Sequence, residues 1–223
     1  MKSFLRLCVV ALVLIWPASM VAQDPLKVDP AHYKVVLENA SVRVLRVSYP
    51  VGAKSVMHQH PDALIVALST AKVRFTLPDG KTQDSDFANE GATYTPAGTH
   101  TPANIGSTAV DGILIEFKDA AAGKAVLPTS RPNMTVKVLA EGPRASAFRA
   151  TASAAFAEPA GTKHDFDQVV IALSAAPLSL SIDGKPAKTT WARGEAVFIG
   201  RGVGHEAKNT GGKPGDMIVV AIK

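Results

Sequence analysis

The chain has 223 residues, of which 47% are hydrophobic, and it carries 24 Lys and Arg against 19 Asp and Glu. This composition excludes an intrinsically disordered chain, which needs low hydrophobicity and a high net charge. The formal net charge of +5 comes from basic residues that are scattered and form no runs, so we expect no nucleic-acid partner.

Residues 1–22 have the composition of a secretory signal peptide. Lys2 and Arg6 precede an unbroken apolar run over 7–16, and a proline and small residues follow it. A transmembrane helix needs about 20 apolar residues, so this run is too short for one. We expect the segment to be cleaved, with no stable membrane insertion afterwards; an uncleaved membrane anchor is the alternative.

The predicted cleavage changes the chemistry that is available to the mature chain. It removes Lys2 and Arg6, so the net charge falls from +5 to +3, and it removes Cys8, the only cysteine. The mature chain can then form no disulfide and use no thiolate as nucleophile or metal ligand. We expect it to be periplasmic or secreted.

The rest of the chain has the punctuation of a β protein. Short apolar or alternating runs are separated by Gly, Pro, Asn or Asp, and no stretch keeps a 3.6-residue period. This pattern is typical of an all-β sandwich or barrel. In chain order, the clearest runs are 33–37, 42–47, 64–68, 73–77, 92–95 and 113–117.

The second half of the chain repeats the first in the same order. A period near 100 residues is too long for a solenoid and fits two copies of one domain. We therefore predict a first domain over 23–119, a linker over 120–133 and a second domain over 134–223. The recurring pairs are 65–69 with 170–174, 79–81 with 183–185, and His100 with His205.

Three histidines of the first copy are the candidates for chemistry. His58 and His60 stand at i and i+2 of a predicted strand, so their imidazoles project to the same side. If a neighbouring strand brings His100 beside them, the three can bind one divalent ion, which can be Fe, Mn, Zn, Cu or Ni. Three protein ligands leave coordination positions open, as in catalytic sites.

The motifs around these histidines resemble those of the cupin superfamily, in its two-domain (bicupin) form. The first motif of that family is Gly, five residues, His-x-His, three or four residues and Glu, and Gly52 with His58-Gln59-His60 matches its beginning. The second motif is Gly, five residues, Pro-x-Gly, two residues, His, three residues and Asn. The segment from Gly91 to Asn104 matches it with one residue fewer in each of the first two intervals.

The resemblance implies two tandem RmlC-like jelly-roll β-barrels with a metal site. It does not fix the reaction, because cupins include dioxygenases, isomerases, decarboxylases, sugar-binding proteins and storage proteins. The segments 58–62 and 73–81 also look like a group of small bacterial cupins that includes a beta-alanine degradation protein.

The glutamate of the first motif is missing. Counting by strand alternation from the two histidines, positions 62, 64, 66 and 68 should face inward, which puts Leu64 at the glutamate's place. Asp62 is a candidate substitute ligand. Tyr94 is a candidate acid/base or orienting group, although a structural role is preferred for it. For Glu116 we prefer a solvent-facing charge to a ligand.

The second copy has lost part of the site. Aligned through the repeat, the two histidines of the first motif become Lys163 and Asp165, and His164 should point away unless a bulge shifts the register. His205 keeps the place of the second motif's histidine. We expect this copy to act as scaffold; the alternative is a weak site from His164, Asp165 or Asp167, and His205.

The function that these observations favour is an exported bicupin with one divalent metal in the first barrel. We expect a metal-dependent enzyme, dioxygenase- or isomerase-like, that acts on a small organic molecule. The alternatives are a non-catalytic periplasmic protein that binds a metal or small ligand, and a structural cupin without metal. Self-association into a homodimer is left open.

Overall fold

The computed structural model describes residues 23–118, 125–175 and 178–223, so the expected signal peptide lies outside the described residues. The described chain is built almost wholly of strands, and each of the runs named above overlaps one of them. The elements of the first half are α1 (Pro25–Val28), β1 (Tyr33–Glu38), β2 (Val42–Tyr49), β3 (His58–His60), β4 (Ala63–Ala67), β5 (Ala71–Thr76), β6 (Thr82–Phe87), β7 (Ala92–Thr95), β8 (Gly98–Asn104) and β9 (Val110–Phe117). Those of the second half are β10 (Met134–Glu141), β11 (Ala145–Ala152), β12 (Asp167–Ala172), β13 (Leu178–Ile182), β14 (Lys185–Lys188), β15 (Ala196–Ile199), β16 (His205–Asn209) and β17 (Gly215–Ile222).

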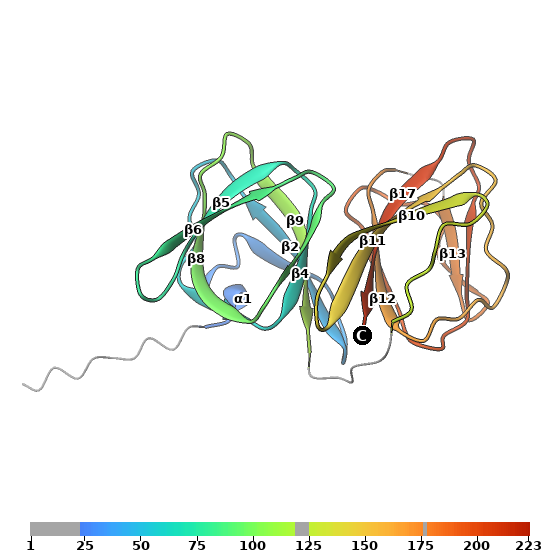
Figure 1. The fold of residues 1–223 in the computed structure, drawn as a ribbon, viewed down its shortest axis with the longest axis horizontal. Helices are drawn as coiled ribbons and strands as arrows, with labels where there is room; N and C mark the ends of the chain where they lie inside the picture. The colour runs from blue at the N-terminus through green and yellow to red at the C-terminus, as the bar shows by residue number, and fades with distance from the viewer. Residues whose placement is uncertain (1–22, 119–124, 176–177) are drawn as a thin grey trace, which may run out of the picture.

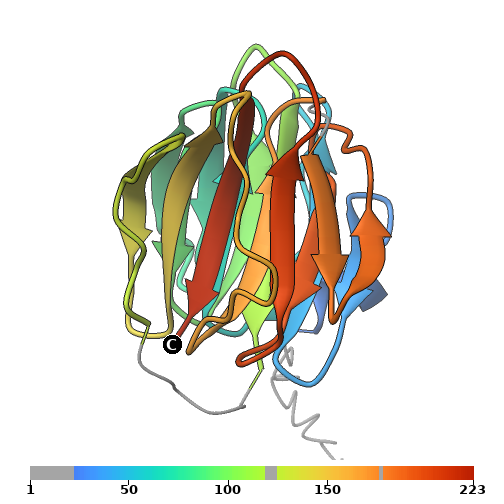
Figure 2. The same ribbon diagram turned by 90° about the vertical axis from the view of Figure 1, so that its right-hand side faces the viewer.

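The strands form two barrels that lie side by side (Figure 1). In the first barrel, a five-stranded sheet in the order β1-β2-β9-β4-β7 faces a four-stranded sheet in the order β3-β8-β5-β6. In the second, a five-stranded sheet β10-β11-β17-β12-β15 faces a three-stranded sheet β14-β13-β16. The view turned by 90° looks onto the second barrel (Figure 2). The expected all-β fold of two jelly-roll barrels is confirmed.

The two five-stranded sheets pack against each other through one apolar core. Side chains alternate along a strand, so every second residue of these sheets faces the other barrel. Burying such a side chain completely is worth about 1.5–3 kcal/mol. The core contains Val42, Val44, Leu64, Val66, Ile113, Ile115 and Phe117 from the first barrel, and Ala145, Ala147, Val169, Ile171, Ile218, Val220 and Ile222 from the second.

The position of Leu64 corrects the expected inward face of β4. Leu64 and Val66 face the second barrel, while Ala63 and Ile65 face the interior of the first. The alternation starting at His60 does not continue into β4, because Pro61 and Asp62 separate the two strands and reverse the side that each residue faces.

Polar contacts at the rim join the barrels as well. The guanidinium of Arg193 in the second barrel donates to the carbonyl of Leu68 at 3.0 Å and to the carboxylate of Glu90 at 2.9 Å. Ser41 donates its hydroxyl to the carboxylate of Asp167 at 2.7 Å. Together with the shared apolar core, these bonds make the two barrels one packed unit.

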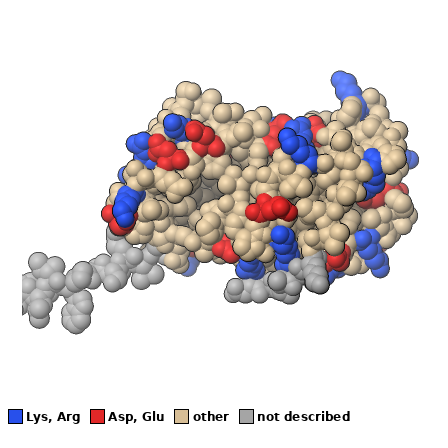
Figure 3. Space-filling model, in the orientation of Figure 1, with Lys and Arg blue, Asp and Glu red and all other residues tan. Residues whose placement is uncertain are grey.

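The surface carries both signs of charge. On the face drawn in Figure 3, Lys and Arg lie interspersed with Asp and Glu, and no continuous basic patch is visible there. Within the described part of the chain, no helix is long and apolar enough to cross a membrane.

Candidate metal centres

The three histidines predicted in the first barrel lie together. His58 and His60 point to the same side of β3, and the register of β3 and β8 pairs His58 with His100. The ring centroid of His100 lies 5.2 Å from that of His58 and 4.9 Å from that of His60. His58 and His60 are buried and His100 is half-buried, so the cluster is largely removed from water.

Hydrogen bonds orient two of these imidazoles. Nδ1 of His58 lies 2.9 Å from the carbonyl of Val56, and Nδ1 of His60 lies 2.7 Å from that of Pro61. A carbonyl only accepts, so each Nδ1 carries the proton and each Nε2 keeps its lone pair, as a metal ligand requires. Burial lowers the pKa of His58. Burial and the neighbouring charges of His60 and His58 lower the pKa of His100 to about 3.

The histidines line one end of a large cavity inside the first barrel. Its volume is about 450 Å³, and most of its lining is apolar or aromatic. Phe75 packs against the ring of His100 with a centroid distance of 4.7 Å. Among the described residues that line this cavity, none is Lys or Arg.

Tyr33 is a member of this site that the sequence analysis missed. Its hydroxyl lies 3.1 Å from Nε2 of His58, and because Nδ1 of His58 holds the ring proton, the hydroxyl is the donor. Burial and the nearby Tyr49 raise the pKa of Tyr33 well above its ordinary value, which keeps it protonated. In the sequence, Tyr33 is an ordinary aromatic residue at the start of a strand, and nothing marks it as functional.

The two other groups considered for the first site make structural contacts, and Tyr94 is also among the residues that line the cavity. The carboxylate of Asp62 accepts a hydrogen bond of 2.7 Å from the backbone N–H of Ala97, which supports the loop before β8. Tyr94 stacks on Phe117 in the core between the barrels, with centroids 6.1 Å apart, and burial raises its pKa to about 12. Both arrangements are structural.

The expectation that Glu116 faces solvent is wrong. Glu116 is fully buried, and its Oε2 accepts a hydrogen bond of 2.5 Å from Nε of Arg43. It pairs across the sheet with Ala63 and faces the interior of the first barrel, on the same side of β9 as Leu114. Arg43 also binds Asp24 at 2.5 Å, so one half-buried guanidinium holds two carboxylates.

In the second barrel, the register differs by one residue from the expected alignment. Thr162 pairs with His205 as His58 pairs with His100, so His164 takes the place of His60. The ring of His164 lies 5.0 Å from that of His205, which corrects the expectation that it points away. Five residues separate His164 from Val170, whereas four separate His60 from the matching Ile65, and this extra residue shifts the alignment.

Glu158 completes a cluster in the second barrel, and the sequence analysis missed it. Its backbone N–H donates to Ala207 as that of Ser55 donates to Pro102, so Glu158 occupies the place of Ser55. Ligand atoms of Glu158, His164 and His205 all lie within 4.8 Å of one another, and no other group among the described residues meets this separation. To match Glu158 with Ser55, an alignment of the two halves needs a gap, and the sequence alone does not indicate where that gap falls.

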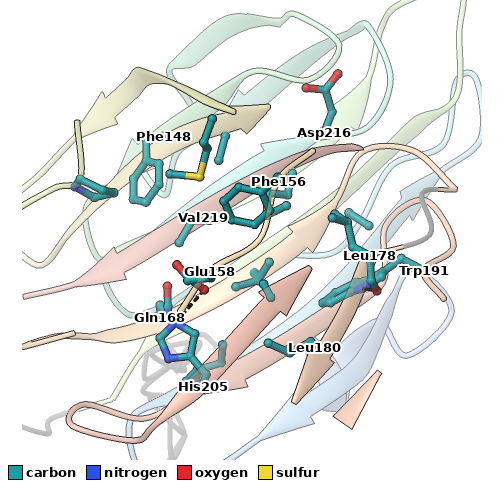
Figure 4. A pocket seen from close by; sticks show the side chains of 18 of the residues that line it. Phe148, Phe156, Glu158, Gln168, Leu178, Leu180, Trp191, His205, Asp216 and Val219 are labelled. Atoms are coloured by element: carbon teal, nitrogen blue, oxygen red, sulfur yellow. Dashed lines mark hydrogen bonds and ion pairs between the residues drawn. The ribbon is translucent and has the colours of Figure 1, made fainter. Parts of the chain in front are cut away.

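The two aspartates weighed for the second site are not part of this cluster. Asp165 is exposed. Asp167 accepts hydrogen bonds of 2.7 Å from the backbone N–H of Arg201 and from the hydroxyl of Ser41, and so serves the interface. Figure 4 shows Glu158 and His205 facing each other at one end of a narrow apolar pocket.

Comparison with known proteins supports the fold. No protein-family model and no curated protein matches the chain by sequence. In structure, it is similar to a cupin 2 conserved barrel domain protein from Leptotrichia buccalis, at a TM-score of 0.55 and 12% identity over 86% of this chain and 88% of that one. It is similar to oxalate decarboxylase from Lactobacillus farciminis, at a TM-score of 0.63 and 10% identity over 82% and 77% of the two chains. It is also similar to salicylate 1,2-dioxygenase from Pseudoaminobacter salicylatoxidans, at a TM-score of 0.61 and 9% identity over 82% of this chain and 70% of that one.

At these identities, the likenesses establish the fold and leave the activity open. The protein has the cupin fold. With two such barrels in one chain, it has the architecture of a bicupin. The expected likeness to a beta-alanine degradation protein is not addressed by these comparisons and stays a prediction.

Proposed function

We propose that the chain is an exported bicupin that binds a divalent metal through His58, His60 and His100 and converts a small organic molecule in the cavity of the first barrel. The observation that carries the proposal is that three neighbouring imidazoles line a cavity of about 450 Å³. Two similar structures, an oxalate decarboxylase and a salicylate 1,2-dioxygenase, are by their names enzymes of small organic acids.

The donor set of three imidazoles suits a metal in its chemistry, although the ring nitrogens do not all lie within 4.8 Å of one another in this structure. Burial disfavours the charged form of His58 and His100, so both rings stay neutral and able to bind a cation. The backbone carbonyls of Val56 and Pro61 fix the tautomers of His58 and His60. A divalent ion held there would polarise a substrate oxygen or activate water or dioxygen.

The remaining steps belong to the chain itself. The apolar lining excludes water and orients the substrate toward the histidines. Tyr33 holds a proton 3.1 Å from Nε2 of His58, and it lines the same cavity, so its hydroxyl can donate a hydrogen bond to a substrate oxygen. Since none of the described lining residues is Lys or Arg, we favour a neutral or aromatic substrate over a dicarboxylate such as oxalate.

The proposal is tested by metal content and turnover together. The protein is purified from the compartment to which the cell exports it, and its metals are weighed by mass spectrometry beside a His58→Ala, His60→Ala, His100→Ala variant. We expect this variant to hold one metal equivalent fewer than the wild type, and a His164→Ala, His205→Ala variant of the second barrel to keep that equivalent. The wild type is then incubated with neutral phenols and dioxygen, and products are followed by mass spectrometry.

Each outcome has a definite meaning. Product formation that the triple variant lacks would support the enzyme. A metal bound without conversion of any compound would favour the alternative, a periplasmic binding protein. The absence of a metal that depends on His58, even after reconstitution, would overturn the proposal and favour a structural cupin.

A further inference from the structure

A second group of potential metal ligands lies in the barrel that was expected to be scaffold. Nε2 of His205 and Oε2 of Glu158 face each other at 3.6 Å, and both side chains are buried. This separation is too long for a hydrogen bond. Two ligands of one tetrahedral zinc ion, each about 2.0–2.1 Å from the metal, stand about 3.3–3.5 Å apart. The observed spacing is therefore close to that of two atoms that share a cation.

Neighbouring groups hold the ligands in orientations that suit a cation. Nδ1 of His205 lies 3.3 Å from the carbonyl of Val203, which directs its proton there and leaves the lone pair on Nε2. Arg131 binds the other carboxylate oxygen of Glu158 at 3.0 Å, and this leaves Oε2 turned toward His205. His164 stacks on Phe166 with centroids 5.0 Å apart, which fixes the third ring beside that of His205.

We propose that Glu158, His164 and His205 form a second divalent-metal site, of the zinc type, in the second barrel. The carboxylate comes from the segment before the histidines, at the place that Ser55 takes in the first barrel. It is thus not the glutamate of the first motif, which would follow the histidines. The amide of Gln168 lies beside Glu158 and His205 (Figure 4) and can supply a further oxygen.

The surroundings assign this ion a structural role. The pocket in front of it has a volume of only about 80 Å³, against about 450 Å³ in the first barrel. Phe148, Phe156 and Trp191 fill the pocket, and they leave room for little more than water. An ion that binds the folded barrel and not the unfolded chain raises the stability of the fold.

The experiment removes the histidines of the first barrel, so that any metal binding that is measured comes from the second barrel. The full chain with His58→Ala, His60→Ala and His100→Ala is freed of metal and titrated with Zn²⁺ by calorimetry and with Co²⁺ by visible ligand-field absorption. We expect one equivalent of each ion, and a rise in Tm on addition of Zn²⁺. This readout does not depend on activity, so it stays informative if the proposed function fails.

The matched variants are Glu158→Gln and Asp165→Asn, which each remove one carboxylate from a position close to His164 in the sequence. Loss of an outer-shell partner costs roughly 10- to 100-fold in metal affinity, so loss of a ligand should cost at least as much. We expect this weakening in Glu158→Gln and none in Asp165→Asn, whose side chain is exposed.

A second variant is available in case Glu158→Gln does not fold. If Glu158→Gln does not fold, His164→Gln gives the same test, because His164 is only half-buried. No Zn²⁺ bound by the triple variant, or equal weakening in Glu158→Gln and Asp165→Asn, would overturn the proposal.

Discussion

The hydroxyl of Tyr33 lies 3.1 Å from Nε2 of His58, the nitrogen that a metal in the first barrel would need. The two residues are 25 positions apart in the chain and meet because β1 and β3 come together at one end of the barrel. Their ring planes are nearly perpendicular, at 77° with centroids 5.3 Å apart. The hydroxyl thus donates to the lone pair that a metal would use, so a metal bound at His58 would require the hydroxyl to turn away.

Replacing Tyr33 by Phe tests whether its hydroxyl is needed for metal binding or only for turnover. We expect Tyr33→Phe to keep its metal equivalent, because the three imidazoles remain. Turnover should fall about 10²-fold, the lower end of what a positioned proton donor contributes. Mass spectrometry of bound metal and steady-state kinetics on the same preparation check this. Loss of the metal with Tyr33 would show that the hydroxyl positions the ligands instead.

Acid should destabilise the metal-free protein before its carboxylates titrate. The pKa of His100 is lowered from 6.5 to about 3 by burial and by His60 and His58. The unfolded chain therefore binds more protons than the folded one between these values, and stability falls as pH drops below about 6.5. His58, whose pKa is also lowered, acts in the same direction.

The measurement is the Tm of metal-free protein from pH 7 down to pH 4.5. The range stops there because 4.5 is the ordinary pKa of Glu, below which carboxylates would contribute. We expect a decline in the wild type and a flatter profile in His100→Gln, which lacks the titrating ring. A His32→Gln variant is the control for loss of an imidazole outside the cluster, because His32 does not line the cavity. Parallel profiles for all three proteins would contradict the assignment.

The buried pair of Glu116 and Arg43 should matter more than a surface pair. Glu116 is fully buried, so Glu116→Ala leaves the guanidinium of Arg43 with only Asp24 as a partner. Breaking a fully buried ion pair by removing one partner costs about 3–5 kcal/mol, and because Arg43 is half-buried and keeps Asp24, we expect a loss at the lower end, about 3 kcal/mol. Denaturant unfolding should show a loss of free energy of this size. A matched change in an exposed pair, Asp84→Ala opposite Arg74, should cost no more than about 1 kcal/mol.

Leu64 tests the interface between the barrels. It is fully buried in the shared core, so Leu64→Ala should lower the free energy of unfolding by about 2–5 kcal/mol. The metal content of the first barrel should not change, because Leu64 faces away from its cavity. Unfolding followed by denaturant and metal weighed by mass spectrometry check both parts. Loss of the metal without the expected loss of stability would contradict this prediction and indicate that Leu64 contributes to the metal site.

Local sequence was sufficient to predict the strands and the first histidine cluster. His58 and His60 share a side because alternate residues on one strand do so, whatever surrounds them. The spacing of the motifs then predicted that His100 lies on a neighbouring strand. In the structure, it pairs with His58. The repeat predicted two copies of the domain, since equal sequence patterns fold to equal barrels.

The tertiary structure decided which face each residue takes where the strands are interrupted. Between His60 and β4, and again between Glu158 and His164, short irregular segments reset the alternation. A shift of one residue moves a side chain to the opposite face of a sheet. For this reason, the sequence could not place Leu64 in the interface, Glu116 in the interior, or Glu158 beside the two histidines of the second barrel. Those positions depend on pairing between distant strands, which only the folded chain defines.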